Sequence, residues 1–479
     1  MYLMPDIRTR FAPSPTGFMH VGNLRTGLFA WLTARHAGGQ FILRLEDTDK
    51  NREVEGSADH ILDCLNMLGL NRDEGIDVGG PHAPYVQSER LAIYKEWAQK
   101  LINVGRAYAD PYTSEEVQAF REQAQAEKRA FLYRNHRPEN PPVWDGSQPL
   151  RFKSEPKSYS WSDAVMGDLS AGEEVIDDII LIKSDGYPTY NFAHIVDDAE
   201  MQITHVIRGQ EFVSSTPNYL NIYEALGVER PVYATVPHIL NEQGNKKLGK
   251  RDGAKDVLDY VREGYLPETM LGFIATLGWN DGTEQEIYTR DELVAKFTLD
   301  RVQKSGARFD EKRLLWMNGQ FIRELSLDDL WNRVANFWPQ EAEGSDSDFK
   351  RKVLALAQDR LKTLADLPIL TNYFFAEPMP DWQMLEYNKQ LNKIDHMHRK
   401  QLLENAKTAL EQTDFSADKL QETLNNLLEQ TGEKPGVLFS LIRFAITWAP
   451  FSPALPETME VLGRDRTLDR LQQAIDSAV

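Results

Sequence analysis

One stretch, residues 8–49, constrains the fold of this chain more than any other, because a helix pattern stands there between two strand patterns. Residues 7–12 and 41–45 are short and largely apolar, as buried strands are. Between them, apolar residues recur at helical spacing, at Leu24, Leu28, Trp31 and Leu32. Strand, helix and strand in this order form a βαβ unit, whose strands lie parallel. The stretch therefore predicts an α/β fold built on a parallel sheet.

The loop between the first strand and the helix carries more polar chemistry than a connection needs. Two prolines and a glycine turn its backbone and leave three polar side chains pointing outward, Ser14, Thr16 and His20. Asn23 is the expected N-cap of the helix. Gly22 allows close approach, and the helix start is electropositive, so a phosphate can bind there. The loop is interpreted as a nucleotide phosphate site.

Neither common nucleotide fingerprint is present in this loop. No GxGxxG follows the strand, and no Lys precedes the helix. The string HVGN after PSPTG resembles the HIGH motif of class I aminoacyl-tRNA synthetases. The longer string RFAPSPTGFMHVGNLRTGLF resembles glutamyl-tRNA synthetases of the bacterial type. The resemblance implies a Rossmann-like catalytic domain.

A second motif, KKLGKR at residues 246–251, places positive charge in a loop of an acidic chain and resembles the class I KMSKS loop. Residues 244–250 also have the spacing GxxxxGK of a P-loop, but Arg251 stands where Ser or Thr binds magnesium. A P-loop nucleotidase therefore stays open as an alternative. A non-catalytic tRNA-binding relative is a second alternative.

Composition limits the class of protein further. The 479 residues are enough for several hydrophobic cores, and the net charge of -19 argues against indiscriminate nucleic-acid binding. Cys64 is the only cysteine, which excludes internal disulfides and cysteine-built zinc sites and is typical of a reducing cytoplasm. No apolar signal core or membrane-spanning segment is found. We expect a cytoplasmic monomer without membrane association.

Residues 87–184 are predicted to form an α+β insertion, with helices at 89–104 and 115–129. The resemblance implies that this is the connective domain that holds the acceptor end of tRNA. Some family members carry zinc here on a Cys-x-Cys pair, where this chain has Asp110 and Tyr112, and His136 alone cannot make a zinc site. We therefore expect no zinc. The apolar strand at 175–183 is expected to return to the parallel sheet.

The chemistry that the resemblance implies is attack of the glutamate α-carboxylate on the α-phosphate of ATP, followed by transfer of the glutamyl group to tRNA(Glu). ATP brings Mg²⁺, and activation in this family requires bound tRNA. His20 and Lys250 are the expected catalytic residues. The expected ATP-binding residues are His20, Gly22, Asn23, Glu211, Leu240, Lys247 and Lys250. The expected glutamate-binding residues are Arg10, Ser14, Glu46, Tyr190, His194 and Arg208.

Some of these assignments also have a physical argument from the residues. Arg10 and Arg208 offer the planar forks that bind carboxylates, and Arg208 follows a strand at 203–207, at the sheet edge where ligands bind. Glu46 also ends a strand and can accept an ammonium group. By resemblance Tyr190 orients the side-chain carboxylate, and some members have Asn where His194 falls.

Residues after 260 follow a helical pattern, and residues 326–479 resemble the all-α anticodon-binding region of the family. The expected domains are 1–86 with 185–236 (catalytic), 87–184 (insertion), 237–325 (stem contact, with the KLGKR loop) and 326–479 (anticodon binding). Arg360 is predicted to fall within the apolar stripe of a helix at 348–367. One interpretation is a structural, salt-bridged Arg. By resemblance, it faces the last anticodon base and admits tRNA(Glu) but not tRNA(Gln).

Overall fold

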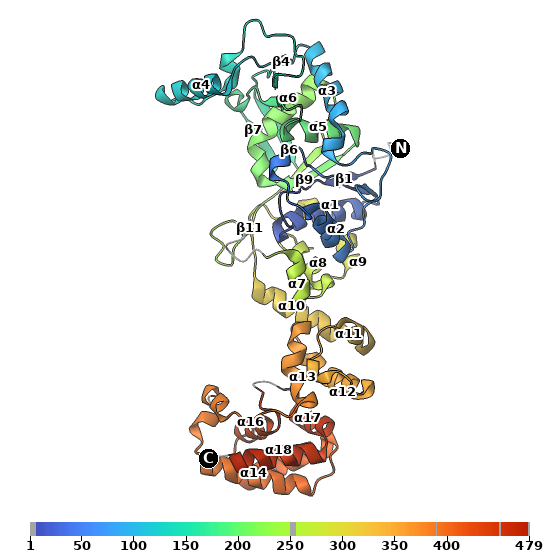
Figure 1. The fold of residues 1–479 in the computed structure, drawn as a ribbon, viewed down its shortest axis with the longest axis vertical. Helices are drawn as coiled ribbons and strands as arrows, with labels where there is room; N and C mark the ends of the chain where they lie inside the picture. The colour runs from blue at the N-terminus through green and yellow to red at the C-terminus, as the bar shows by residue number, and fades with distance from the viewer. Residues whose placement is uncertain (1–5, 250–254, 389, 450–451, 478–479) are drawn as a thin grey trace. The chain divides into compact units, whose positions relative to one another are not determined.

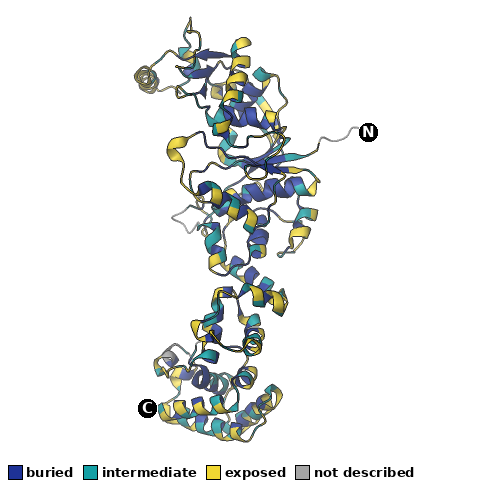
Figure 2. Cartoon of the chain, turned by 45° about the vertical axis from the view of Figure 1, so that its right-hand side comes forward, coloured by how far each residue is buried: buried dark blue, intermediate teal, exposed yellow. Residues whose placement is uncertain are grey.

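The computed structural model describes residues 6–249, 255–388, 390–449 and 452–477. The chain divides into two compact units (Figure 1). The first unit comprises Met1–Tyr260 and Met270–Glu311, and the second comprises Val261–Thr269 and Lys312–Val479. Each unit has its own buried apolar core, coloured dark blue in Figure 2.

A seven-stranded sheet organises the first unit, in the order β3-β2-β1-β9-β10-β6-β7. All neighbours pair in parallel except β6 and β7, which form an antiparallel hairpin at one edge. The prediction of a parallel sheet is confirmed. The strands are β1 (Arg8–Phe11), β2 (Gln40–Leu43), β3 (Glu74–Gly75), β6 (Tyr159–Asp163), β7 (Gly167–Ala171), β9 (His205–Gly209) and β10 (Val232–Val236).

Helix α1 (Val21–His36) connects β1 to β2, as the pattern predicts. It approaches β1 closely at Gly27, where a Cβ atom would lie 3.1 Å from the Phe11 ring, so a small residue fits best there. The predicted N-cap, Asn23, is wrong, because the helix begins two residues before it. His20 is the N-cap, and its Nδ1 accepts a hydrogen bond from the Gly22 N–H at 3.1 Å. Further helices of this unit are α2 (Ser57–Met67), α5 (Tyr190–Glu200), α6 (Thr216–Leu226) and α9 (Arg290–Lys296).

A three-stranded antiparallel sheet lies within the predicted insertion, in the order β4-β5-β8. It packs with α3 and shares a core with α5 and α6, in which Trp97, Phe152 and Tyr219 are buried. The strand expected to return to the parallel sheet is β8, which instead pairs antiparallel with β5. The hairpin β6–β7, also from residues 87–184, joins the large sheet. The elements are α3 (Leu91–Asn103), β4 (Ala107–Ala109), α4 (Ser114–Ala126), β5 (Leu150–Phe152) and β8 (Ile180–Ile182).

After β10 the chain forms the short strand β11 (Ile239–Leu240), which pairs with β12 (Ala307–Arg308). Residues 241–247 turn back, since the Asn241 N–H donates to the Lys246 carbonyl at 3.0 Å and Leu240 bridges Lys247. In a P-loop the glycine-rich residues run from a strand toward a helix, whereas residues 241–247 fold back on β11 as a hairpin. This hairpin argues against the P-loop alternative. Helices α7 (Val257–Arg262) and α8 (Pro267–Ala275) follow.

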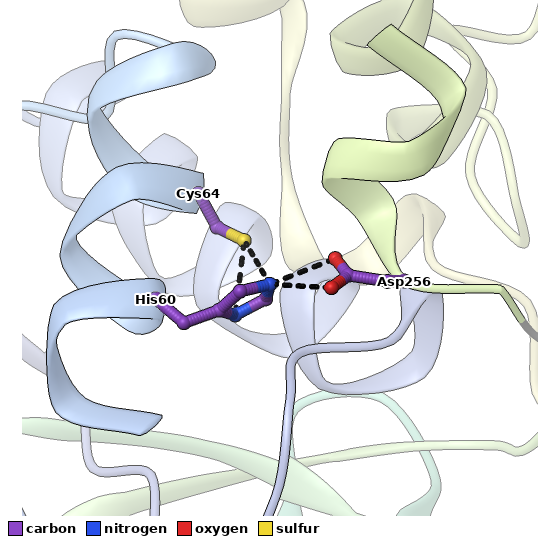
Figure 3. A group of neighbouring side chains, drawn as sticks. All are labelled: His60, Cys64 and Asp256. Atoms are coloured by element: carbon purple, nitrogen blue, oxygen red, sulfur yellow. Dashed lines mark hydrogen bonds and ion pairs between the residues drawn. The ribbon is translucent and has the colours of Figure 1, made fainter. Parts of the chain in front are cut away.

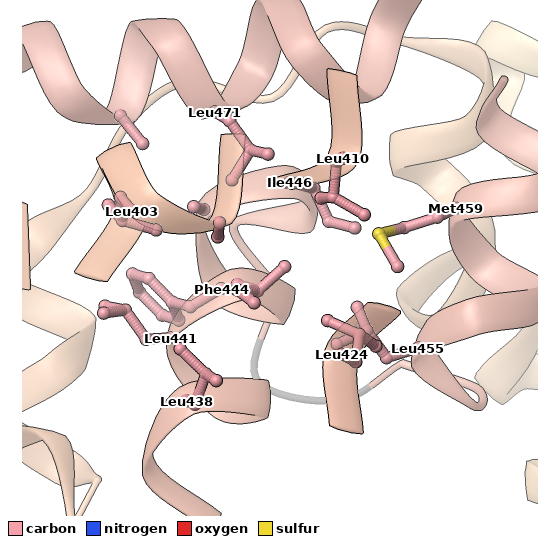
Figure 4. Packing of buried hydrophobic residues seen from close by; sticks show 14 of the residues in the cluster. Leu403, Leu410, Leu424, Leu438, Leu441, Phe444, Ile446, Leu455, Met459 and Leu471 are labelled. Carbon is pink, nitrogen blue, oxygen red and sulfur yellow. The ribbon is translucent and has the colours of Figure 1, made fainter. Parts of the chain in front are cut away.

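The regular elements of the second unit are helices and 3-10 turns, with no strand among its described residues, which confirms the predicted all-α region. Leu403, Leu441, Phe444, Met459 and Leu471 are among the buried residues of its core (Figure 4). The helices are α10 (Glu311–Glu324), α11 (Leu327–Arg333), α12 (Ser347–Ala357), α13 (Leu367–Phe375), α14 (His396–Glu411), α15 (Ala417–Thr431), α16 (Pro435–Thr447), α17 (Leu455–Leu462) and α18 (Arg464–Ser477).

The single helix expected at 348–367 is wrong. Helix α12 ends at Ala357, and a 3-10 turn, Gln358–Arg360, follows it before the next short turn begins at Leu364. The side chain of Arg360 is exposed and does not lie in an apolar stripe. Among the described residues, no helix combines the length and apolar character that crossing a bilayer requires.

Candidate active site

A cavity of about 460 Å³ opens at the carboxyl ends of β1 and β9, beside the start of α1. This edge of a parallel sheet is where ligands bind in open α/β folds. The predicted site residues that line the cavity are Arg10, Ser14, His20, Gly22, Asn23, Glu46, Tyr190, Arg208, Glu211 and Lys247. His194 and Leu240 are not among its lining residues. Lys250 lies outside the described residues, and Arg360 belongs to the second unit.

The start of α1 forms one wall of the cavity and suits an anion. A Cβ atom at Gly22 would lie 3.0 Å from the His20 ring, so glycine leaves room for the capping imidazole. The first turn contains no acidic residue that would neutralise the positive end of the helix dipole. Backbone N–H groups and the His20 side chain can therefore meet a phosphate here.

A buried group of charges lies beneath the opposite wall, centred on Arg44. This arginine donates to Glu46 at 2.9 Å and to Asp198 at 2.8 Å, while Arg10 donates to Asp198 at 3.1 Å. Burial raises the pKa of the Glu46 carboxyl, and Arg44 and Arg10 oppose that shift. Burial acts on Asp198 in the same direction, but the two arginines outweigh it and hold the pKa of Asp198 below its ordinary value. The network fixes Arg10 and Glu46 at the cavity wall.

Arg208 is a buried cation whose hydrogen-bonding capacity is not used within the protein. Its Nη2 donates to Thr216 Oγ1 at 2.6 Å, but Nε and Nη1 are buried and have no hydrogen-bond partner among the described residues. The guanidinium lies 4.2 Å from the centre of the Tyr233 ring and 5.3 Å from that of Tyr219. Leaving buried donors unpaired costs free energy, so a ligand with acceptor oxygens is expected against this face.

Tyr190 and His194 stack in helix α5, with ring centroids 4.7 Å apart. Only Tyr190 reaches the cavity, so His194 supports it from behind. Burial raises the pKa of Tyr190, which therefore keeps its phenolic proton. Burial lowers the pKa of His194 to about 3. Its Nδ1 lies 2.7 Å from the Tyr190 carbonyl and donates to it, so the buried Nε2 is an unpartnered acceptor.

On the far side of the cavity, Glu211 lies 3.8 Å from both Lys247 and His238. Gly209 stands close by, where a Cβ atom would meet the Glu211 carboxylate at 2.2 Å. The glycine therefore lets the carboxylate fold back against the strand end. Lys247 is the one lysine among the described residues that line the cavity. The cavity wall thus carries both cations and carboxylates.

The described part of the chain contains one group of three donors close enough to hold a metal ion, namely His60, Cys64 and Asp256 (Figure 3). None of the three lines the cavity.

Three residues of the charge network have no role in the sequence-based prediction, Arg44, Asp197 and Asp198. A signal for each is present in the sequence. Arg44 interrupts an otherwise apolar strand, and the two aspartates follow an apolar run in a helix whose face is buried. A charge at a buried position needs a partner of opposite sign, and here the partners are one another.

The comparisons with known proteins agree with this geometry. Residues 6–316 match the family model described as tRNA synthetases class I (E and Q), catalytic domain, and residues 329–475 match the model described as anticodon binding domain. The fold and the cavity are therefore those of a class I aminoacyl-tRNA synthetase.

Individual relatives show which kind of class I synthetase this chain resembles. The chain is 40% identical to a glutamate–tRNA ligase of Clostridium botulinum over 98% of both chains, and 41% identical to one of Dehalococcoides mccartyi over 98% of this chain and 97% of that one. A crystal structure of a glutamate–tRNA ligase from Elizabethkingia meningosepticum in complex with its amino acid has a TM-score of 0.87 at 32% identity, covering 99% of this chain and all of that one. This chain belongs to the glutamate–tRNA ligases, as the sequence motifs predict.

The first prediction concerns the neutral His194. Its pKa in the folded state lies below the ordinary histidine value of about 6.5, so the unfolded state binds the extra proton between about pH 6.5 and 3. Stability is therefore lost as the pH falls below about 6.5. We expect the wild-type protein to lose about 2 kcal/mol more than His194→Asn between about pH 7.5 and 5 in urea unfolding. Equal losses of unfolding free energy in the two proteins would contradict the conclusion that burial keeps His194 neutral in the folded state.

Proposed function

We propose that the cavity binds glutamate and ATP next to each other and joins them as a glutamyl-adenylate, from which the glutamyl group passes to tRNA(Glu). A glutamate carboxylate oxygen attacks the α-phosphorus, and the bond to the leaving diphosphate breaks. A terminal ribose hydroxyl of the tRNA then attacks the carbonyl carbon, and AMP leaves. Neither step needs a protein nucleophile, so the protein acts by positioning and by stabilising charge. The unpaired nitrogens of buried Arg208 carry this proposal.

Glutamate has two carboxylates and one ammonium group, and the cavity offers matching partners. Arg208 supplies two donors for one carboxylate. Arg10, fixed by Asp198, faces the same cavity and serves the other. Glu46 accepts the ammonium group, and Tyr190 and Ser14 add hydrogen bonds to the carboxylates. Because His194 lies behind Tyr190, its role is to hold this ring in place.

ATP is proposed to place its phosphates at the start of α1, against His20, Gly22 and Asn23. Lys247 and Glu211 flank the opposite side of the cavity. Ile239 lines the cavity where the sequence suggested its neighbour Leu240. Lys250 remains the second predicted catalytic residue, and this prediction rests on the sequence motif alone.

Magnesium is implied by the use of ATP. A Mg²⁺ ion that arrives with a nucleotide takes phosphate oxygens and water, with one or two protein carboxylates at most. Glu211, whose side chain is half-exposed at the cavity, could supply one such carboxylate. The ion would neutralise phosphate charge, while His20 and the α1 backbone hold the phosphates in place.

The second prediction tests the role of Arg208. Lysine keeps the charge but not the fork, so Arg208→Lys should lower kcat/KM for glutamate roughly ten- to hundredfold while KM for ATP changes little. The assay is ATP–pyrophosphate exchange with tRNA(Glu) present. Arg35→Lys, at the far end of α1 and hydrogen-bonded to Asp73, is the matched control. Equal losses for glutamate and ATP, or no loss, would reject the assignment.

We propose that Arg360 lets the enzyme discriminate tRNA(Glu) from tRNA(Gln). Arg360 is exposed in the second unit, and its charge contributes, after burial, to lowering the pKa of Arg443 on α16. Within the part of the chain that the structure describes, the buried Nε of Arg443 has no hydrogen-bond partner. Two guanidinium groups held near each other attract phosphates and the acceptor atoms of a base. The donors suit the acceptors of cytosine, the last anticodon base of glutamate tRNA in the family resemblance.

The third prediction follows from that assignment. Arg360→Gln should raise charging of tRNA(Gln) relative to tRNA(Glu) by about tenfold, since one good contact to a base is worth about 1–3 kcal/mol of discrimination. Lys362→Gln removes the same charge two residues away and is the control. Aminoacylation of the two purified tRNAs is the measurement. The assignment is wrong if the wild-type enzyme charges both tRNAs equally, or if the variant unfolds.

The fourth prediction is that the enzyme works without zinc. The Asp110 carboxylate is already bonded to Arg151 at 2.5 Å, Tyr112 packs on Phe120, and His136 stacks on the same ring at 4.2 Å. We expect elemental analysis of active protein to find no stoichiometric zinc, and activity to survive chelation once magnesium is restored. Stoichiometric zinc whose removal abolishes aminoacylation would refute this.

The predicted domain boundaries at residues 86, 184, 236 and 325, the monomeric state and the cytoplasmic location stay predictions from the sequence. The relatives imply ATP, glutamate and tRNA(Glu) as partners of this chain.

A further inference from the structure

His60, on helix α2, lies outside the cavity but contacts two segments next to it. Its Nε2 lies 2.7 and 2.8 Å from the two carboxylate oxygens of Asp256, which is 196 residues away in the chain. Its Nδ1 lies 3.3 Å from the backbone nitrogen of Met19. Cys64, one turn further along α2, packs its sulfur beside the ring (Figure 3).

The geometry of this group does not suit a shared metal ion. The Cys64 sulfur lies 3.6 Å from Nδ1 and 4.0 Å from Nε2 of His60, almost equally far from both ring nitrogens. A zinc ion binds an imidazole nitrogen along its in-plane lone pair, at about 2.0–2.1 Å, with sulfur about 2.3 Å beyond. That arrangement would leave the sulfur much closer to one nitrogen than to the other. The group is therefore a hydrogen-bonded pair with a thiol packed against it.

The hydrogen bonds also determine where the His60 proton lies. The Met19 N–H can only donate, so Nδ1 of His60 is the acceptor. The proton is then on Nε2, which donates to the Asp256 carboxylate. Each nitrogen thus binds a different segment of the chain. The pair is largely shielded from water, with side-chain exposures of 10% and 17%, and this strengthens a bond to a charged acceptor.

The two segments that His60 joins also contact each other. The backbone of His20 bridges that of Asp256, and the Val257 N–H donates to the Met19 carbonyl at 3.3 Å. The ring of Phe18 packs on the His60 ring, with centroids 4.8 Å apart. One segment leads directly into His20 and the start of α1, while Asp256 follows the KLGKR motif by five residues. His60 therefore links the segment that leads into the HVGN motif to the segment that follows the KLGKR motif.

We propose that His60 is a positioning residue for adenylate formation, and that its bond to Asp256 holds Met19 and His20 in the geometry that ATP requires. This inference rests on the proposed function of the cavity. Small displacements of groups that orient reacting atoms reduce rates strongly, whereas ground-state binding of a distant substrate group is affected less. The loss is therefore expected mainly in kcat, with KM for glutamate unchanged.

The fifth prediction tests this role by ATP–pyrophosphate exchange with tRNA(Glu), measured for His60→Ala, Asp256→Ala and the double variant. Each single variant should lower kcat, His60→Ala roughly tenfold because it loses its bonds to both Asp256 and Met19. The double variant should lose no more than His60→Ala, because the bond that Asp256→Ala removes is already absent there. His60→Gln, which keeps a donor and an acceptor, should recover part of the loss. Thermal melting establishes that each variant is folded at the assay temperature.

Cys64→Ala is the matched control, because it removes the thiol one turn from His60 and leaves the bond to Asp256 intact. We expect its kcat to equal that of the wild-type enzyme. The positioning role is overturned if folded His60→Ala keeps full kcat, if the single losses multiply in the double variant, or if Cys64→Ala loses as much as His60→Ala and a bound metal with it. Wild-type protein without glutamate-dependent exchange would instead overturn the proposed function itself.

Discussion

The catalytic unit depends on one buried interaction, the bonds from Arg44 to Glu46, two residues further along the chain, and to two aspartates of α5. Arg44 is fully buried, and its guanidinium contacts Glu46, Asp198 and Asp197, the last at 3.5 Å. Arg10 and Arg90 complete the group at 3.1 and 2.7 Å from Asp198 and Asp197. Removing Arg44 would leave Glu46 without its ion-pair partner, and an unpaired buried charge is strongly destabilising. The network joins β1, the segment that follows β2, and α5.

This arrangement explains how one small cavity holds both signs of charge. Arg10 and Glu46 reach its wall, yet each is already neutralised from behind by a network partner. Arg208 differs, because its only side-chain bond is to the neutral hydroxyl of Thr216 and aromatic rings surround it. Its charge is therefore the one that we propose pairs with a substrate carboxylate. Binding of an acidic substrate would therefore require little rearrangement of these side chains, as is typical of preorganised electrostatic sites.

The sequence predicts local features better than distant pairings. The βαβ unit follows from periodicity between residues 7 and 45, and it is present as expected. The antiparallel pairing of β8 with β5, the Arg44–Asp198 bond and the His60–Asp256 bond join positions far apart in the chain, which no local pattern contains. Arg360 shows a different source of error, in which a local pattern continues beyond the end of the helix. Leucines after Ala357 continue a helical spacing, but the backbone turns there, so the pattern alone misplaces the side chain. The motif strings identified most cavity residues because they mark strand ends and a helix start, and these meet at one edge of a sheet.

The acidic composition of the chain has a consequence for how it recognises tRNA. With 54 basic against 73 acidic residues, a general attraction to phosphate cannot supply most of the binding free energy. The cations that contact nucleic acid must be few and held in place. Arg360 and Arg443 are the pair that we propose for this role, since burial and repulsion from Arg360 both disfavour the charged form of Arg443. In this proposal, a base or phosphate bound at the pair relieves that cost only when its acceptors fit the two guanidinium groups. Such a site favours choice between similar tRNAs over affinity for all of them, which is what a ligase with one cognate amino acid requires.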